Sequence, residues 1–299
     1  MTITIKTSFI RRLYLHLLNA YSRYINRFSV YRIAFRYFIK TLVIVGTKTL
    51  DMQFPSRVTG GWWWTWRWRW EMIMQWHEYE TVQWCQQLVK PGMVVLDIGA
   101  HIGYFTWLFS DLVGPSGKVI AFEPCPENYP LLLHNIKARG CHVAEPVCVA
   151  LSDEIGEVEL FISKGNTTHS LNKEFTQNQE GSVRVRSTTV DAYMANVNHL
   201  PVGFVKIDVE GVEPQVLTGM MDTIYRNPEL VMVVELNPKA LEAGGYRAEE
   251  LIAQLEALGF VPKAIKEDGE LVPPFEDSSR KVQNLLCLRA SSQVKISLY

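Results

Sequence analysis

The amino-acid sequence predicts an α/β protein with an open, mostly parallel β-sheet that is covered by helices on both faces. From residue 78 onward, short apolar runs typical of buried strands alternate with amphipathic helical segments. Such alternation is the pattern of a parallel sheet. The last two apolar runs are joined by a polar loop, which favours an antiparallel C-terminal hairpin. The first 75 residues follow a different pattern and predict a helical arm and a Trp-rich strand.

The individual elements follow from local signals along the chain. The expected helix over 77–89 is ended by Pro91, and the one over 126–140 has a proline at its start and a glycine at its end. Continuous apolar runs bounded by turn residues predict the strands. In chain order, the expected strands cover 93–99, 118–124, 146–153, 157–163, 182–190, 203–211, 230–238, 260–265 and 282–289, and the remaining helices begin near Gly103 and Glu213 or cover 248–259.

Charge is unevenly distributed along the chain. The 299 residues hold 30 Lys+Arg and 31 Asp+Glu, a formal net charge of -1. The first 50 residues contain nine basic residues and no acidic one, so the remainder carries 21 basic and 31 acidic residues. An acidic body of this kind argues against a nucleic-acid partner. The hydrophobic content of 47% excludes a wholly disordered chain.

Residues 1–50 predict a basic, amphipathic helical arm. Apolar residues recur at helical spacing over 10–28, and Arg32, Arg36 and Lys40 follow at steps of four. Such helices can lie on an anionic membrane surface. They can equally pack on the body of the protein or on a second copy of the chain, and the sequence leaves these alternatives open.

Residues 51–75 form a Trp-rich connector. Tryptophans occupy every even position from Trp62 to Trp70, and a period of two predicts a strand with one indole face. Indole rings could stack on a ligand, fill a core or form a contact between subunits. We therefore expect either peripheral membrane contact or homo-oligomer formation through residues 1–75.

Cysteine usage and apolar run length bear on the compartment. The five cysteines include no CxxC pair, which favours a reducing compartment. No apolar run approaches the roughly 20 residues that span a bilayer, and the first residues do not resemble a signal peptide. We expect a cytoplasmic protein, either unattached or at the inner face of the membrane.

A glycine-containing turn follows the first strand of the predicted sheet, where Asp97, Gly99 and Gly103 lie within the run LDIGAHIG. Glycine lets a backbone approach a ligand closely, and a helix N-terminus offers unpaired N–H groups. Ligands of open parallel sheets bind at the carboxyl ends of the strands. Glu123 ends the second strand, 24 residues after Gly99, where its carboxylate could accept both hydroxyls of a ribose.

The residues of this turn discriminate between nucleosides. A pyrophosphate cradle for NAD has three glycines, whereas this loop has two, in the pattern D-x-G-x-x-x-G. The loop also lacks the Lys-Ser/Thr pair of a P-loop. Asp97 would repel a diphosphate but would suit the amino and sulfonium groups of S-adenosylmethionine. An NAD-dependent oxidoreductase remains a lesser alternative.

Three ordered motifs give the chain a resemblance to a known family. VVLDIGAHIGYFT (94–106), FEPCPENY (122–129) and VKIDVEGVEPQVLTG (205–219) together resemble the FkbM family of S-adenosylmethionine-dependent methyltransferases. The similarity extends over 76–290, which we expect to be the S-adenosylmethionine-binding methyltransferase domain, and 291–299 would be a tail. The resemblance implies the Rossmann-like sheet of class I methyltransferases.

The resemblance also implies roles for matched positions. The methionine and sulfonium side of the cofactor site would be formed by Asp97, Gly99, His101 and Gly103, the ribose would bind Glu123, and the adenine would lie beside Ser152 and Asp153. Asp208 would lie next to the methyl group. Glu80 would close over the cofactor from the preceding helix. Cys125 stands where the family usually carries a polar residue, which weakens any side-chain contact there.

Transfer to a hydroxyl also requires a base. A positioned carboxylate or histidine that takes the acceptor proton contributes roughly 10²–10⁴-fold to the rate. Asp208 is our first candidate and Glu210 the second, and strand alternation would place both on the same side as Lys206. His101 and His169 are further candidates, and a structural role is the alternative for each.

The sequence therefore predicts an S-adenosylmethionine-dependent methyltransferase that O-methylates a sugar, glycolipid or secondary metabolite. The main alternative is a non-catalytic nucleotide-binding module that docks to a membrane or a protein partner. We expect no metal requirement. Mg²⁺ is an alternative, because Asp208, Glu235 and Asn237 would offer three oxygen ligands at adjacent strand ends.

Overall fold

The computed structural model describes residues 37–38, 40–41, 44–45, 51–54, 68–74, 76–163, 169–171, 179–276 and 282–290. The chain divides into two compact units. The first contains residues 1–50 and 60–78, and the second contains residues 51–59 and 79–299.

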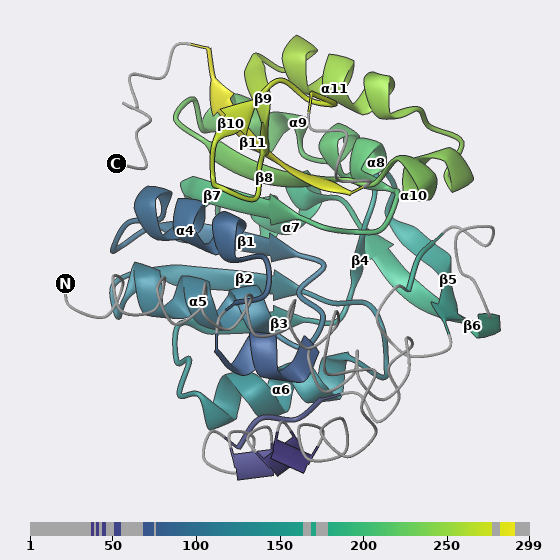
Figure 1. Cartoon of the computed structure of the whole chain (residues 1–299). Coiled ribbons are helices and arrows are strands. Elements are labelled where there is room, and N and C mark those ends of the chain that lie inside the picture. Colours follow the sequence, from purple (N-terminus) through teal and green to yellow (C-terminus); the bar gives the residue numbers. More distant parts are fainter. Residues whose placement is uncertain are drawn as a thin grey trace, which may run out of the picture. The chain divides into compact units, whose positions relative to one another are not determined.

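The second unit is built on a large sheet with the strand order β10-β9-β11-β8-β7-β1-β2-β3 (Figure 1). Its strands are β1 (Val94–Ile98), β2 (Lys118–Phe122), β3 (Ala144–Val147), β7 (Val202–Ile207), β8 (Val231–Leu236), β9 (Phe260–Ile265), β10 (Leu271–Val272) and β11 (Gln283–Arg289). From β3 to β8 all neighbouring strands are parallel. β11 lies antiparallel between β8 and β9, and β10 pairs with β9 at the outer edge. The predicted open parallel sheet with antiparallel C-terminal strands is therefore confirmed.

Helices cover both faces of this sheet, and strand alternation explains how. The helices are α4 (Tyr79–Leu88), α5 (Tyr104–Val113), α6 (Tyr129–Ala138), α7 (Val190–Asn196), α8 (Glu213–Thr218), α9 (Met221–Arg226), α10 (Pro238–Ala243) and α11 (Ala248–Ala257). Leu96 and Ile98 of β1 belong to the main core together with residues of α7, α8 and α11. On the opposite face, Phe109 of α5 packs against Phe204 of β7, with ring centroids 5.5 Å apart. Asp97, between Leu96 and Ile98, lies on that second face.

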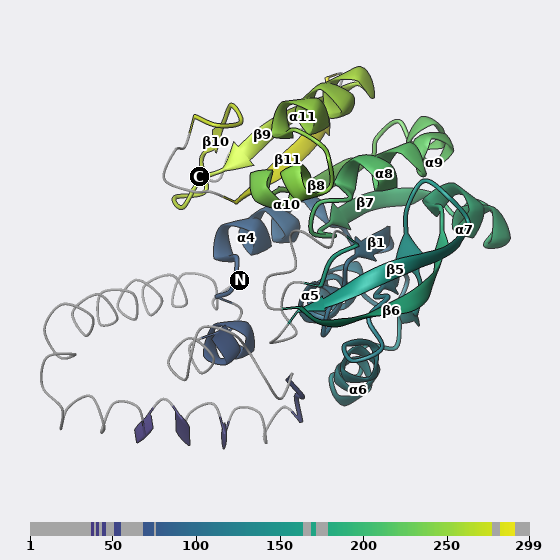
Figure 2. The same cartoon turned by 90° about the vertical axis from the view of Figure 1, so that its right-hand side faces the viewer.

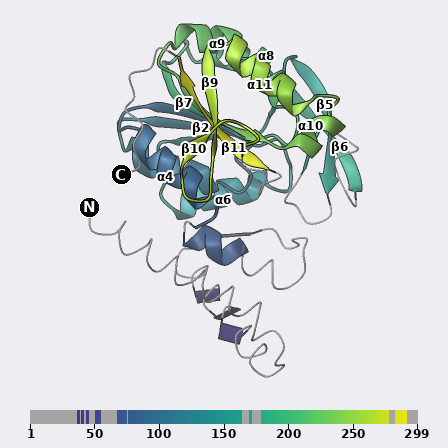
Figure 3. The same ribbon diagram turned by 45° about the horizontal axis from the view of Figure 1, so that its top comes forward.

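A small second sheet has the order β4-β6-β5 and consists of β4 (Ala150–Leu151), β5 (Gly156–Ser163) and β6 (Gln179–Thr188). Figures 1 and 3 show β5 and β6 at one side of the domain, with α4 on the other. Figure 2 shows β5 crossing in front of the large sheet. Leu160 and Val185 of this sheet pack with Ala150 and Cys125 in a separate small core. The strands expected over 157–163 and 182–190 thus pair with each other in a sheet of their own.

The third predicted strand, over 146–153, is wrong as a single element. The chain leaves the large sheet after Val147, where the Val149 N–H bonds the Val147 carbonyl at 3.2 Å in a tight turn. Residues 150–151 then pair with β6 as β4. The sequence analysis also missed three short helices and β10, because these elements are too short to show a hydrophobic period.

In the first unit, the predicted Trp-rich strand is wrong where the structure describes it. Residues 68–73 are helical, and the Met74 N–H bonds the Trp70 carbonyl at 3.0 Å, the spacing of a helix. A period of two also contains neighbours four apart, which a helix places on one face. Trp62, Trp64 and Trp66 lie outside the described residues, as does most of the predicted arm over 1–50. Of that arm, 37–38, 40–41 and 44–45 are helical.

Among the helices that the structure describes, none combines the length and the apolar character needed to cross a bilayer.

Candidate functional site

The turn after β1 is shaped by two glycines. Gly99 has φ 87°, and a Cβ at this position would lie 1.8 Å from the Asp208 carbonyl oxygen. The Asp208 N–H donates to the Ile98 carbonyl at 3.0 Å, so the ends of β1 and β7 are held against each other. Gly103 has φ 90°, and a Cβ there would meet Leu132 of α6 at 2.8 Å. These glycines allow the close packing that brings Asp97 and Asp208 to the same edge of the sheet.

Asp97 lies at this edge but is 1% exposed. Its Oδ2 accepts a hydrogen bond of 2.6 Å from the Thr106 hydroxyl in the first turn of α5. This contact fixes the carboxylate at the start of the helix. Direct contact between Asp97 and a cofactor remains a prediction.

Glu123 follows β2 and is held by backbone amides. Its Oε2 accepts from the His101 N–H at 2.8 Å, and its Oε1 accepts from the Cys125 N–H at 2.9 Å. Burial raises the pKa of Glu123 to about 7, while these two hydrogen bonds act in the opposite direction. His101 has a positive φ of 52°, which aims its amide at the carboxylate. His101 and Cys125 therefore contribute to the site through their backbone.

Ser152 and Asp153 follow β4 and not a strand of the large sheet. The Ser152 N–H donates to the Thr188 carbonyl at 3.0 Å, and its hydroxyl donates to Asp153 Oδ1 at 2.9 Å. A Cβ on Gly219 would lie 2.1 Å from the Ser152 carbonyl oxygen, so this segment packs on the junction of α8 and α9. A contact of either residue with adenine remains a prediction.

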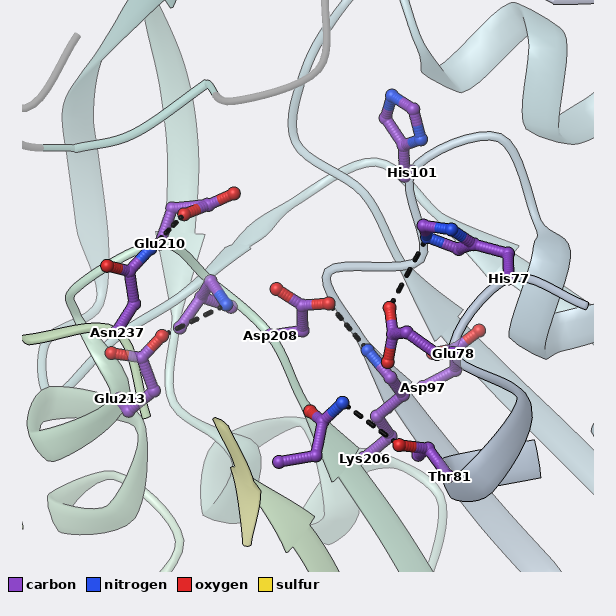
Figure 4. A network of polar contacts seen from close by, with 12 residues as sticks. His77, Glu78, Thr81, Asp97, His101, Lys206, Asp208, Glu210, Glu213 and Asn237 are labelled. Carbon is purple, nitrogen blue, oxygen red and sulfur yellow. Dashed lines mark hydrogen bonds and ion pairs between the residues drawn. The ribbon is translucent and has the colours of Figure 1, made fainter. Parts of the chain in front are cut away.

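Asp208 follows β7 and forms an ion pair with Lys206. The Lys206 ammonium lies 2.6 Å from Asp208 Oδ2 and 4.5 Å from the centroid of the Phe105 ring (Figure 4). The Lys206 side chain is 3% exposed and that of Asp208 is 24% exposed. Asp208 Oδ1 has no hydrogen-bond partner among the described residues. Oδ2 of Asp208 is thus paired with the Lys206 ammonium, and Oδ1 is accessible.

Glu210 reaches the same region by a turn. The sequence predicted that β7 would continue to Glu210 and place it on the same side as Asp208 by strand alternation. The predicted continuation is wrong, because β7 ends at Ile207 and Glu210 has φ 56°. Glu210 Oε2 accepts from the Asn237 side-chain amide at 3.3 Å (Figure 4). Burial raises the pKa of Glu210 well above its ordinary value, and the Asp208 charge adds to this effect.

Glu213, to which the sequence analysis gave no role, lies beneath this turn. It is fully buried, and its carboxylate accepts from the N–H groups of Gly211, at 3.1 Å, and Val209, at 3.3 Å. Burial raises the pKa of Glu213 to about 7. The V-E-G-V-E spacing was the available signal, because an acidic residue in the first turn of a helix can satisfy preceding backbone amides.

Glu235 completes a group of carboxylates. Its Oε2 is buried and has no hydrogen-bond partner among the described residues. Asp208, Glu210 and Glu235 each offer a carboxylate oxygen, and these three atoms lie within 4.8 Å of one another. Burial, and then the charge of Asp208, raise the pKa of Glu235 well above its ordinary value. Asn237, which the sequence analysis considered as a metal ligand, caps α10 through its Oδ1 and holds Glu210 through its amide.

The remaining candidates from the sequence are His169 and Glu80. His169 precedes Ser170, whose hydroxyl donates to the Glu210 carbonyl at 2.7 Å. His169 Nδ1 accepts from the Ser163 N–H at 3.2 Å, and burial lowers the pKa of His169 to about 4. Glu80 is buried in the first turn of α4, and its contact with a cofactor remains a prediction.

Comparison with known families identifies the domain. Residues 97–262, more than half of the chain, match the family described as the methyltransferase FkbM domain. The match contains the turn after β1, Glu123, Asp208 and Glu235. The match decides against both alternatives raised from the sequence, an NAD-dependent oxidoreductase and a non-catalytic module.

Individual relatives agree with this match. The chain is 29% identical over 149 residues to hexuronic acid methyltransferase AglP of Haloferax volcanii, covering 49% of this chain and 58% of AglP. It is 28% identical over 174 residues to 31-O-demethyl-FK506 methyltransferase FkbM of Streptomyces tacrolimicus, covering 49% of this chain and 65% of that protein. The alignments thus span less than two thirds of either relative.

A solved structure with a similar fold is Aeropyrum pernix fibrillarin with bound S-adenosyl-L-methionine. Its TM-score is 0.38 at 15% identity, over 70% of this chain and 73% of fibrillarin. The family match over residues 97–262 decides the assignment. The chain belongs to the FkbM family of methyltransferases, whose methyl donor is S-adenosyl-L-methionine.

Proposed function

We propose that this enzyme transfers the methyl group of S-adenosylmethionine to a hydroxyl of a sugar, glycolipid or secondary metabolite. The observation that carries this proposal is the accessible Oδ1 of Asp208, at the edge of the sheet where β1 and β7 are held together. The names of AglP and FkbM, which refer to a hexuronic acid and to an FK506 precursor, support a sugar or a secondary metabolite.

The cofactor would lie across the carboxyl ends of β1 and β2. Glu123 would accept hydrogen bonds from the ribose hydroxyls, because its two oxygens are already oriented by backbone amides. The turn with Asp97, Gly99 and Gly103 would face the methionine end, and this end would direct the methyl group towards Asp208. Ser152 and Asp153 would lie at the adenine end.

In the proposed reaction, a hydroxyl oxygen of the acceptor attacks the methyl carbon in line with the C–S bond. The new O–C bond forms as the C–S bond breaks, and the bonding electrons leave with sulfur as S-adenosylhomocysteine. The hydroxyl proton moves to Asp208 Oδ1. The products are a methyl ether and a protonated Asp208, so that alignment and one positioned base account for the step.

Asp208 is a better base than Glu210 for a physical reason. Burial raises the pKa values of Glu210 and Glu235 well above their ordinary value, which favours the protonated, non-basic form of both carboxyls. Asp208 instead pairs with the ammonium of Lys206 at 2.6 Å through Oδ2, and its Oδ1 has no hydrogen-bond partner among the described residues. The protonated Glu210 and Glu235 would serve as hydrogen-bond donors to neighbouring oxygens of the acceptor.

A divalent cation would also fit these carboxylates. Asp208, Glu210 and Glu235 supply the hard oxygen ligands that Mg²⁺ prefers, and the unpartnered Oε2 of Glu235 is consistent with such a ligand. When bound, the ion would lower the pKa of the acceptor hydroxyl. We expect transfer without added metal, so activity should survive treatment with EDTA. Loss of activity in EDTA that Mg²⁺ restores would favour the metal site instead.

Transfer of labelled methyl groups tests the proposal directly. The full chain should move tritiated methyl groups from S-adenosylmethionine to carbohydrate or lipid fractions of a cell extract. Asp208→Asn should slow this transfer roughly 10²–10⁴-fold, the usual contribution of a positioned base. It should leave the affinity for S-adenosylhomocysteine within about twofold, because the loss of the base acts on the chemical step. Full turnover by Asp208→Asn would exclude Asp208 as the base.

A further inference from the structure

His169 carries a buried nitrogen that the described structure leaves without a partner. His169 follows β5 and precedes β6 in the sequence, and its Nδ1 accepts a hydrogen bond from the Ser163 N–H at 3.2 Å. The other ring nitrogen, Nε2, is buried and has no hydrogen-bond partner among the described residues. Buried polar atoms are nearly always paired, so a nitrogen of this kind near a binding region is a candidate for contact with a ligand.

The Ser163 contact determines which nitrogen carries the proton. Burial, and then the charge of His101, lower the pKa of His169 to about 4, so the ring is neutral at physiological pH. A neutral imidazole has one N–H and one acceptor nitrogen. Since Nδ1 is occupied as an acceptor, the proton resides on Nε2. His169 can therefore donate a hydrogen bond from Nε2, but it cannot serve as the base that the sequence analysis considered.

Neighbouring contacts link the His169 segment to the edge of the sheet that carries the proposed site. Ser170, the next residue, pairs with Phe161 of β5 and donates to the Glu210 carbonyl at 2.7 Å. The charged groups that affect the His169 ring are His101 and Glu127. His101 belongs to the turn after β1, and Glu127 belongs to the loop after β2. These two segments flank Glu123, whose carboxylate accepts from the His101 N–H.

A ribose hydroxyl can bind a carboxylate and an N–H donor at the same time. An ionised carboxylate only accepts hydrogen bonds, so it uses the hydrogen of a hydroxyl and leaves the lone pairs of the hydroxyl oxygen unoccupied. An imidazole N–H supplies the complementary donor. We propose that His169 is a cofactor-binding residue whose Nε2–H donates a hydrogen bond to a ribose hydroxyl oxygen of S-adenosylmethionine. This inference rests on the proposed placement of the ribose at Glu123.

Two substitutions separate the donor from the structural contact. Asn at position 169 can still accept the Ser163 N–H but has no group at the position of Nε2. Gln can extend an N–H to that position. We expect His169→Asn to weaken the binding of S-adenosylhomocysteine about fivefold in calorimetry, the usual value of one neutral hydrogen bond, and His169→Gln to recover most of it. His142→Phe, at an exposed histidine, is the control and should bind as the wild type does.

Analogues of the ligand identify the contact itself. The measurements are repeated with S-adenosylhomocysteine lacking either the 2′- or the 3′-hydroxyl. The loss caused by His169→Asn should disappear with one of the two analogues, because that ligand lacks the accepting oxygen. Thermal unfolding of each variant checks that the fold is retained.

Other outcomes would overturn the inference. Wild-type affinity in His169→Asn would exclude the hydrogen bond. An equal loss with all three ligands would show that His169 acts only on the structure of the segment. Glu123→Gln is an independent test of the ribose placement. If Glu123→Gln weakens the binding of S-adenosylhomocysteine and His169→Asn does not, this inference alone is rejected. Absence of S-adenosylhomocysteine binding by the wild type would reject the proposed function as well.

Discussion

Lys206 provides the counter-charge for a group of carboxylates, and Lys206→Met tests this role. Methionine has a similar length and can pack on the Phe105 ring, but it removes the ammonium that lies 2.6 Å from Asp208 Oδ2. Removing one partner of a buried ion pair costs about 3–5 kcal/mol. Because Asp208 is 24% exposed, we expect the lower end of that range, about 3 kcal/mol at pH 8.

Urea denaturation of the full chain measures this cost. The double variant Lys206→Met/Asp208→Asn should be more stable than Lys206→Met alone, because the second change removes the unpaired charge. A Lys206→Met protein that unfolds within about 0.5 kcal/mol of the wild type at pH 8 would refute the counter-charge role, because surface substitutions have effects of that size.

Three further predictions concern Glu213, Gly99 and the basic arm. Burial raises the pKa of Glu213 to about 7, so the protonated carboxyl stabilises the fold at low pH, and this contribution should be lost as pH rises from about 4.5 to 7. Over this range the free energy of unfolding should fall by about 3 kcal/mol less in Glu213→Gln than in the wild type. The exposed control Glu256→Gln should behave as the wild type does. An equal decline in all three proteins would contradict this assignment. Gly99→Ala should destabilise the domain by about 3 kcal/mol or more, because its Cβ would collide with the Asp208 carbonyl. Gly245→Ala, with φ 80° and no atom near the added carbon, should cost only about 1 kcal/mol, and equal costs would exclude the collision. Deletion of residues 1–50 should abolish sedimentation with anionic liposomes, and equal pelleting with and without the arm would exclude membrane contact through it.

The sequence predicted the parts of the molecule that local pattern determines. Buried parallel strands are continuous apolar runs, so β1, β2 and β8 were found within a residue or two of their bounds, and the start of β7 within one residue. Asp97, Glu123 and Asp208 could be placed at the carboxyl edge of the sheet, because each lies in the last residues of such a strand or directly after it. The Trp-rich segment failed because its period of two fits a helix as well as a strand.

The rest of the site depends on contacts between distant segments. Glu210 reaches the carboxylate group through a positive φ, which a pattern of alternation cannot predict. The role of Ser170 depends on its contact with Glu210, 40 residues away in the sequence. The unpartnered Oε2 of Glu235 and Nε2 of His169 become visible only when burial and hydrogen bonding are known for each atom.

Calorimetry with S-adenosylhomocysteine and with NAD tests the central claim most directly. The full chain should bind S-adenosylhomocysteine and not NAD, and Glu123→Gln should weaken this binding at least tenfold, because the carboxylate that would hold the ribose loses its charge. Binding of NAD in place of S-adenosylhomocysteine, or an affinity unchanged in Glu123→Gln, would contradict it.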